Sequence, residues 1–392
     1  MKFDPYNFKD KYLAWKNGEQ NDLNGLSAEN VEILKQYLYD MEHGLNIGNH
    51  NKKGARSYSR LQSLKFRIIF LMKHFQDRYS LENLTKVDEE KAHVLFVEMR
   101  QGTIRKKDGG QFICVKDYVR DFKAFWHWHQ KVSHKKGIEL QDITTDLDTS
   151  GEKPKWVYLT EEQIKLLAEK SKYDYKVLIY FLFDTGIRAP TELMNVRVSD
   201  FFNNFRELNI RQEISKTFGR RIKLMLSSEL IKEYIKISGL KENDYLFTKT
   251  HSPVNRYLKR ASERLFGDKE SPAGAKYSDL TMYDFRHCSC CYWLPRYKSE
   301  SALKYRFGWK KSDKIHYYSE LLGMSDTISE EDMLLDLTKT EIEKRLCISE
   351  KEKDILTDEV KDLRMQIAQI GQLTRELYKE IKPKIEIIQI GK

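Results

Sequence analysis

The sequence predicts a mainly helical α+β protein with two domains and a C-terminal helical tail. Apolar residues recur at helical spacing along most of the chain, and one stretch has the pattern of a small β-hairpin. A polar segment without apolar periodicity, residues 142–154, divides the chain. The length of 392 residues agrees with two domains, because one hydrophobic core rarely organises so long a chain.

The first half of the chain is expected to be helical. Residues 1–55 form a predicted N-terminal extension, in which Ser27 is the N-cap of a helix. Residues 56–150 form a predicted helical domain. Its first helix starts at Tyr58 and has one apolar face and a basic side.

An aromatic cluster marks a later helix of this first half. Phe122, Phe125, Trp126 and Trp128 are expected to fill the core of the helical domain, since aromatic side chains bury large areas. Stacking on nucleic-acid bases is the alternative.

The second predicted domain covers residues 155–325. Thr160 and Gln163 have the spacing of a capping box. An apolar helix then runs to Thr185. Two β-prone segments, residues 207–211 and 221–226, flank a turn that contains Gly219 and predict a hairpin. The rest of the domain is expected to be helical.

The C-terminal segment, residues 338–382, has apolar residues at three-four spacing, including Leu356, Val360 and Leu363. Two interpretations stay open. The segment is either a coiled coil that joins subunits or a long surface helix that folds back on its own domain.

The charge favours a polyanionic partner. The net charge is +10, and each lysine or arginine that meets a phosphate releases counterions.

The five cysteines do not suggest a disulfide framework, and residues 1–5 lack a signal-peptide core, so a soluble cytoplasmic protein without a membrane partner is expected. The word His287-Cys288-Ser289-Cys290-Cys291 has no zinc spacing and predicts buried small residues on a helix, with no metal.

Four residues in order are the most informative feature of the sequence: Arg188, Lys216, Arg286 and Tyr318. They stand in the words Asp-Thr-Gly-Ile-Arg, Ser-Lys-Thr-Phe-Gly, Tyr-Asp-Phe-Arg-His and Tyr-Ser-Glu-Leu-Leu-Gly. The ordered set resembles the tyrosine recombinase (phage integrase) family, from about Tyr58 to Gly323. The Gly-Trp word and the Tyr-x-x-x-Leu-Gly ending are similar to those of archaeal integrases.

The resemblance implies a role for each residue. Tyr318 would attack a DNA phosphate and form a covalent 3′-phosphotyrosine, while Arg188 and Arg286 would stabilise the charge of the transition state. Lys216 would protonate the leaving 5′ oxygen. Glu192 would orient the cations. The adjacent Tyr317 is expected to pack or to contact DNA.

Two positions depart from the family pattern. Tyr283 and Trp309 stand where the family usually has histidines. Both can donate a hydrogen bond, and Tyr283 cannot act as a base at neutral pH. Both are included among the predicted catalytic residues.

The resemblance also implies a partner and an assembly. Residues 56–150 would be the core-type DNA-binding domain and residues 155–325 the catalytic domain, together forming a clamp around double-stranded DNA. Self-association to a tetramer is expected, with no cofactor. The predicted phosphate contacts are Lys52, Lys53, Arg56, Arg60, Lys65 and Arg67.

Three functions follow from the sequence. The first is a site-specific DNA recombinase or integrase. The second is a DNA-binding protein of the same fold without catalysis, and the third is a topoisomerase of type IB. All four chemistry-bearing residues are present, which favours an enzyme, and the heptads favour assembly on two DNA sites.

Overall fold

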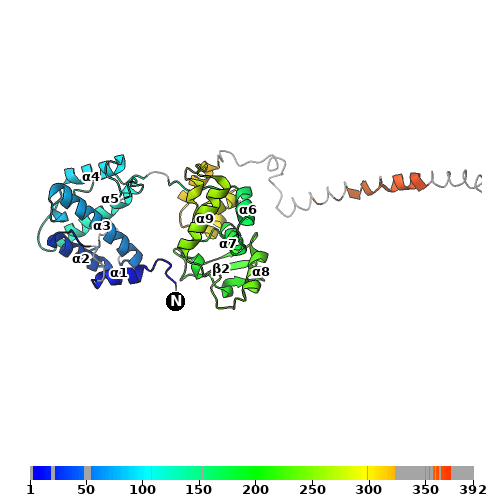
Figure 1. Ribbon diagram of the computed structural model, residues 1–392, viewed down its shortest axis with the longest axis horizontal. Coiled ribbons are helices and arrows are strands. Elements are labelled where there is room, and N and C mark those ends of the chain that lie inside the picture. Colours follow the sequence, from blue (N-terminus) through cyan, green and yellow to red (C-terminus); the bar gives the residue numbers. More distant parts are fainter. Residues whose placement is uncertain are drawn as a thin grey trace, which may run out of the picture. The chain divides into compact units, whose positions relative to one another are not determined.

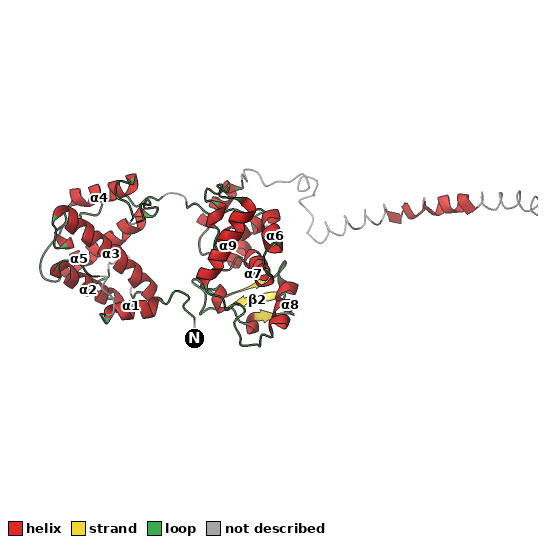
Figure 2. Cartoon of the chain, in the orientation of Figure 1, coloured by secondary structure: helices red, strands yellow, loops and turns green. Residues whose placement is uncertain are grey.

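The computed structural model describes residues 3–18, 23–47, 54–106, 108–151, 154–297 and 299–322, and in the tail residues 349, 353, 356–357, 359–361 and 363–371. The described part is mostly helical with one small sheet, as predicted (Figures 1 and 2). The α-helices are α1 (Phe8–Lys16), α2 (Ala28–His43), α3 (Tyr58–Tyr79), α4 (Glu89–Gln101), α5 (Val115–His134), α6 (Glu161–Glu169), α7 (Tyr173–Thr185), α8 (Ser228–Ser238), α9 (His251–Phe266), α10 (Asp284–Trp293), α11 (Glu300–Phe307) and α12 (Asp313–Leu321). The short 3-10 helices are η1 (Leu84–Lys86), η2 (Leu193–Asn195), η3 (Val198–Asp200) and η4 (Tyr277–Asp279).

Helices α1 to α5 share one hydrophobic core. Tyr12 and Trp15 from α1 and Leu34 from α2 are buried in the same cluster as the apolar face of α3. The predicted boundary at residue 55 therefore does not separate two cores. The first helix contributes few apolar residues, too few to show in the sequence that it belongs to this core.

The local predictions for this half are met. The Ser27 side chain accepts a hydrogen bond from the backbone N–H of Asn30 (3.2 Å), as an N-cap should. The aromatic cluster of α5 is buried, with Phe122 and Phe125 at 0% exposure. The indole of Trp128 also donates to Asp40 of α2 (2.7 Å), which fixes α5 against α2.

A second core begins at Trp156 and extends to Tyr318. Apolar helix α7 contacts α6, α8 and α10, so the residues that follow its C-terminus are held by a buried scaffold. The capping box of Thr160 and Gln163 is formed. The predicted linker, residues 142–154, falls between the two cores, although Ile143 and Leu147 still pack in the first.

The sheet has three antiparallel strands in the order β1-β2-β3. Strands β2 (Glu207–Ile210) and β3 (Arg220–Lys223) form the predicted hairpin, with Leu208 opposite Ile222. Strand β1 (Phe201–Phe202) was not expected, because two residues are too few to show alternation. In Figure 2 the sheet lies close to α7 and α8.

Among the described residues, none of the helices combines the length and the apolar character needed to cross a bilayer.

Candidate active site

The turn after α7 positions the first arginine. Gly186 ends α7 in the left-handed region, with φ of 56°. A Cβ at this position would lie 2.3 Å from the ring of Phe307, so glycine is required both for the turn and for the close approach of α11. Ile187 is buried, and Arg188 follows with its side chain 12% exposed.

A buried carboxylate lies between two arginines. Glu192 is fully buried and contacts Nη1 of Arg188 at 2.6 Å and Nη2 of Arg220 at 2.9 Å. Arg220 is the first residue of β3 and is itself 2% exposed. Its Nε also donates to the carbonyl of Arg306 (2.8 Å), which ties the strand to α11.

Glu192 stays ionised in this environment. Burial alone would raise the pKa of its carboxyl, but the hydrogen bond and charge of Arg220, together with the charge of Arg188, lower the pKa to about 2. The cluster of Arg188, Glu192 and Arg220 therefore has one net positive charge at neutral pH.

Arg286, in the first turn of α10, is also buried, at 3% exposure. Its guanidinium donates to the carbonyls of Gly186 and Phe307 and lies over the rings of Phe307 and Trp309, at 5.4 and 5.8 Å. Burial and the charge of Arg188 lower the pKa of Arg286 to about 10, so it remains a cation.

Gly308 brings the pieces together. Its carbonyl accepts from Nη2 of Arg188 (2.7 Å) and from the hydroxyl of Thr217 (2.8 Å). A Cβ on Gly308 would lie 2.9 Å from Nη1 of Arg220 and 3.2 Å from Nη1 of Arg188. Glycine is therefore required at position 308, because a side chain there would block the approach of the two arginines.

Tyr318, on α12, is next to this cluster but hidden. It is 3% exposed, and its ring is stacked on Trp309 with 5.9 Å between centroids and 9° between planes. Its hydroxyl shares a hydrogen bond with Nδ1 of His287. Burial, with a contribution from Cys290, raises the pKa of the Tyr318 hydroxyl well above its ordinary value, although the charge of Arg286 acts in the opposite direction.

Tyr317 is held differently. Its hydroxyl donates to the carbonyl of Pro154 (2.9 Å) and accepts from Nε1 of Trp156 (2.6 Å). The two neighbouring tyrosines thus contact different groups, and Tyr317 packs against the start of the second core, in line with the packing role expected for it.

The structure brings most of the predicted catalytic residues into one chain of contacts. Arg188, Glu192, Arg286, Trp309 and Tyr318 are linked directly or through the carbonyls described above. Lys216 is exposed in the loop between β2 and β3, next to Thr217. Tyr283 is 46% exposed at the N-cap of α10.

The predicted phosphate contacts are placed less favourably. Lys52 and Lys53 lie outside the described residues, and Arg56 is partly exposed. Lys65 is fully buried, 5.1 Å from the centre of the Trp15 ring, so we withdraw it from the set.

Arg60 and Arg67 are both engaged by one carboxylate. Arg67 contacts Asp121 at 2.8 Å and Arg60 also pairs with it. Arg67 also contacts Asp117 at 3.2 Å. Arg60 can therefore reach DNA only by sharing or leaving Asp121, and Arg67 only by sharing or leaving both carboxylates.

Two residues were missed in the sequence. Arg220 stands at an inward position of β3, where Arg220 and Ile222 alternate with exposed residues. The sequence could have indicated a buried arginine here, because Arg220 lies on the same face of the strand as the apolar Ile222. The second is His287, whose contact with Tyr318 the sequence does not indicate; the sequence places it only in a His/Cys segment without zinc-ligand spacing. The buried Cys288, Cys290 and Cys291 match the interpretation as small core residues.

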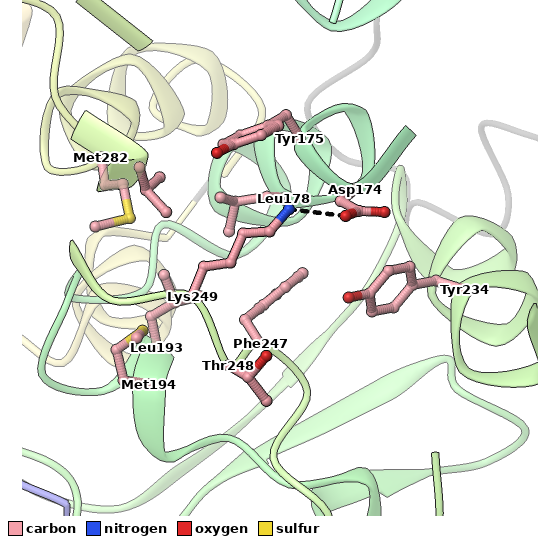
Figure 3. Close-up of a pocket in the computed structure, with 11 residues that line it drawn as sticks. Asp174, Tyr175, Leu178, Leu193, Met194, Tyr234, Phe247, Thr248, Lys249 and Met282 are labelled. Carbon is pink, nitrogen blue, oxygen red and sulfur yellow. Dashed lines mark hydrogen bonds and ion pairs between the residues drawn. The ribbon is translucent and has the colours of Figure 1, made fainter. Parts of the chain in front are cut away.

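A separate pocket of about 110 Å³ is lined by residues that include Leu193 and Met282, sequence neighbours of Glu192 and Tyr283 (Figure 3). Its charged side chains, Lys249 and Asp174, pair with each other at 2.7 Å. The pocket therefore offers apolar contacts and a neutralised ion pair, and none of the predicted catalytic side chains lines it.

No protein-family model and no curated protein matches the sequence. Solved structures do match. The Tn1549 transposon integrase (residues 82–397) in complex with circular intermediate DNA has 15% identity and a TM-score of 0.53, over 74% of this chain and 95% of the integrase. The chain has the fold of this integrase.

Lambda integrase gives two further matches. A dimer of its residues 75–356 bound to a COC′ core site has 15% identity and a TM-score of 0.54, over 76% of this chain and 97% of that one. A lambda integrase tetramer bound to a Holliday junction has 16% identity and a TM-score of 0.51, over 73% and 80%. At these identities the likeness concerns the fold.

Proposed function

We propose that this protein is a site-specific DNA recombinase of the tyrosine recombinase type, which cleaves and rejoins DNA through a covalent 3′-phosphotyrosine. The observation that carries the proposal is the linked set of Arg188, Glu192, Arg286, Trp309 and Tyr318 in a domain with an integrase fold. The likeness to archaeal integrases rests on sequence words alone.

The arginines suit a phosphoryl transfer. In the transition state the nonbridging oxygens of the phosphate gain negative charge, and guanidinium forks are directed donors that remain charged. Arg188 is already oriented by Glu192. The Nε1–H of Trp309 has no hydrogen-bond partner among the described residues and is a further donor for a phosphate oxygen.

DNA binding must rearrange the site before reaction. Tyr318 is 3% exposed and the guanidinium of Arg286 is occupied by two carbonyls. The proposal therefore includes a movement of α12 or of Trp309 that exposes the Tyr318 hydroxyl to a phosphate. Lys216, exposed on its loop, would then protonate the 5′ oxygen.

The reaction needs no external energy, because the phosphotyrosine conserves the phosphodiester bond energy. Cationic side chains would do the work of a metal. Cleavage is therefore expected to continue in EDTA and without ATP. A cytoplasmic location is part of the proposal.

Assembly on DNA is part of the proposal. Recombination between two sites needs several subunits, and the lambda integrase match as a tetramer on a Holliday junction supports a tetramer here. A type IB topoisomerase would relax supercoiled plasmid as a monomer. A supercoil-relaxation assay beside a two-site recombination assay separates the two functions.

The test is a search for the covalent adduct. Protein is incubated with a pool of nicked duplexes of randomised sequence, denatured, and analysed for DNA that stays attached; sequencing that DNA defines the target. Tyr318→Phe should abolish the adduct and Tyr317→Phe should keep it. The reverse pattern would move the nucleophile by one residue. Sequence-specific binding without any adduct would support the non-catalytic alternative and overturn the enzyme.

A further inference from the structure

The Tyr318 hydroxyl must lose its proton in the proposed reaction, and neither the proposed arginines nor Lys216 accepts it. Burial keeps this phenol protonated at neutral pH, and a neutral phenol is a weak nucleophile. Its proton must leave as the oxygen attacks phosphorus. The group that receives the proton must lie within hydrogen-bonding reach of the oxygen.

One side chain meets this requirement. Among the described residues, His287 is the hydrogen-bond partner of the Tyr318 hydroxyl, through Nδ1. Tyr283, at the position where the family usually has a histidine, is half exposed and packs edge-on against the imidazole with 5.2 Å between ring centroids. A phenol there cannot take up a proton at neutral pH, whereas a neutral imidazole can.

The fold holds the His287 ring in place. The imidazole stacks on the indole of Trp156, with 4.7 Å between centroids and 29° between planes. Trp156 is fixed in turn, because its Nε1–H donates to Tyr317. Asp284, in the first turn of α10, accepts from the backbone N–H of Val157 (3.0 Å) and so ties the helix that carries His287 to the segment that carries Trp156.

We propose that His287 is the general base for Tyr318, an inference that rests on the proposed function. In the step, the Tyr318 oxygen forms a bond to phosphorus, the bond from phosphorus to the 5′ oxygen breaks, and the phenolic proton passes to Nδ1 of His287. The 5′ oxygen takes its proton from Lys216. Rejoining reverses each transfer, so that His287 returns the proton to Tyr318.

Titratable side chains lie on both helices around His287. They include Tyr283, Asp284, Arg286, Cys290 and Cys291 at the start of and along α10, and Tyr317 and Tyr318 on α12, while Trp156, stacked on the imidazole, has no charge.

The test separates a base from a hydrogen-bonding partner. In His287→Asn the side-chain oxygen can occupy the place of Nδ1 and accept the hydrogen bond, but it cannot take up the proton. With the duplex recovered by covalent selection, we expect this variant to cleave about a hundredfold more slowly. The wild-type rate should also rise with pH over the range in which histidines lose their proton, and this limb should be absent in the variant.

Two controls make the result specific. Tyr292→Phe, on the same helix, should cleave like wild type. A substrate with a 5′-bridging phosphorothiolate releases a thiolate that needs no proton, so it should restore cleavage by Lys216→Ala and leave the His287→Asn defect unchanged. Equal DNA affinity and melting temperature of His287→Asn and wild type show that the variant is folded; if it is not, His287→Gln replaces it in the same measurements.

Several outcomes would overturn the inference. If His287→Asn cleaves at the wild-type rate and with the wild-type pH profile, His287 only positions Tyr318 and is not its base. Faster cleavage would make the hydrogen bond a latch that holds Tyr318 buried. In both cases the wild-type adduct still forms, so the proposed function survives; if wild type forms no adduct, it is the proposed function that fails.

Discussion

Glu192 holds together two arginines that would otherwise repel each other. Arg188 and Arg220 both contact it, and the carboxylate is fully buried. Removing one member of a buried ion pair is costly, because the remaining charge keeps its desolvation penalty without its partner. Glu192 is therefore a requirement for the site as well as a candidate for orienting the reaction.

We expect Glu192→Gln to lower the free energy of unfolding by about 3 kcal/mol at pH 7. The folded-state pKa of Glu192 is about 2, below its ordinary value of 4.5, so the stabilisation by the ionised carboxylate is complete above pH 4.5 and is lost as the pH falls towards 2. The difference between wild type and variant should thus narrow below pH 4.5. Urea unfolding over a pH series measures it.

The matched control is Asp174→Asn. Asp174 pairs with Lys249, but both side chains are about half exposed, at 53% and 47%. Such a pair contributes no more than about 1 kcal/mol. Equal losses in the two variants would show that Glu192 is not a special site of stability.

Replacing Arg188 by alanine should leave DNA binding largely intact and slow cleavage by about a hundredfold, the loss typical of one transition-state donor. Arg188→Lys keeps the charge without the fork and should recover only part of the rate. Adduct formation and gel-shift affinity are the two measurements. An Arg188→Ala protein that cleaves at the wild-type rate contradicts the assignment.

Arg286→Ala should lose cleavage in the same way but also stability. Its guanidinium satisfies the carbonyls of Gly186 and Phe307, which would be left buried without partners, at a cost of about 1–3 kcal/mol each. Thermal unfolding of the two alanine variants, measured together, should place Arg286→Ala lower. The reverse order would mean that these carbonyls find other donors.

At the scale of elements, local signals predicted local structure. Ser27 caps α2 and Thr160 caps α6, because each side-chain oxygen accepts a hydrogen bond from the otherwise free backbone N–H three residues further on. The hairpin of β2 and β3 followed from alternation around a glycine turn. These features depend on neighbours in sequence, which is why they are readable there.

Buried charges were not predictable in this way. Lys65 was expected on a basic surface, yet it is fully buried, and its ammonium lies over the rings of Trp15 and Phe66. Arg220 is buried because Glu192, distant in sequence, lies opposite it. No local pattern records such a partner.

Helix α9 carries two exposed arginines. Asn255 accepts from the backbone N–H of Met282 (3.0 Å), so α9 lies beside the start of α10 and its exposed Tyr283. Arg256 and Arg260 are exposed on α9 and have no ion-pair partner among the described residues. We expect them to contact phosphates.

Substituting glutamine for Arg256 and Arg260 together should weaken binding to any duplex and reduce the slope of log affinity against log salt by about 2, close to one unit per lost phosphate contact. Titrations at several salt concentrations measure both. The control removes two exposed lysines of the second core, Lys165 and Lys170, and should change the slope little. If both double variants reduce the salt dependence equally, the effect comes from net charge and not from phosphate contacts by Arg256 and Arg260.

Across the whole chain, the order of the predicted catalytic residues was the most informative feature of the sequence. Arg188, Arg286 and Tyr318 lie on different elements, yet carbonyls and stacked rings join them. The hydrogen bond of His287 to Tyr318 was not foreseen, because it depends on how α10 packs against α12. Short sequence motifs do not predict contacts between elements that are far apart in the sequence.

The tail also belongs to this scale. Most of the predicted segment, residues 338–382, lies outside the described residues, but its described part is helical and its apolar residues are exposed. Leu356, Val360, Leu363 and Ile367 are 59%, 46%, 56% and 68% exposed. Apolar side chains at three-four spacing on an exposed helix are typical of a surface that meets another helix.

Removing the residues after Asp336 should therefore spare cleavage at a single site and impair recombination between two sites. The first reaction needs only the residues around Tyr318 in one subunit, whereas the second needs subunits held together, where linked binding raises the effective concentration. Adduct formation, two-site recombination and sedimentation are compared for both proteins. If the truncated protein recombines normally and the full chain sediments as a monomer with and without DNA, the tail does not join subunits, and the exposed leucines have another partner.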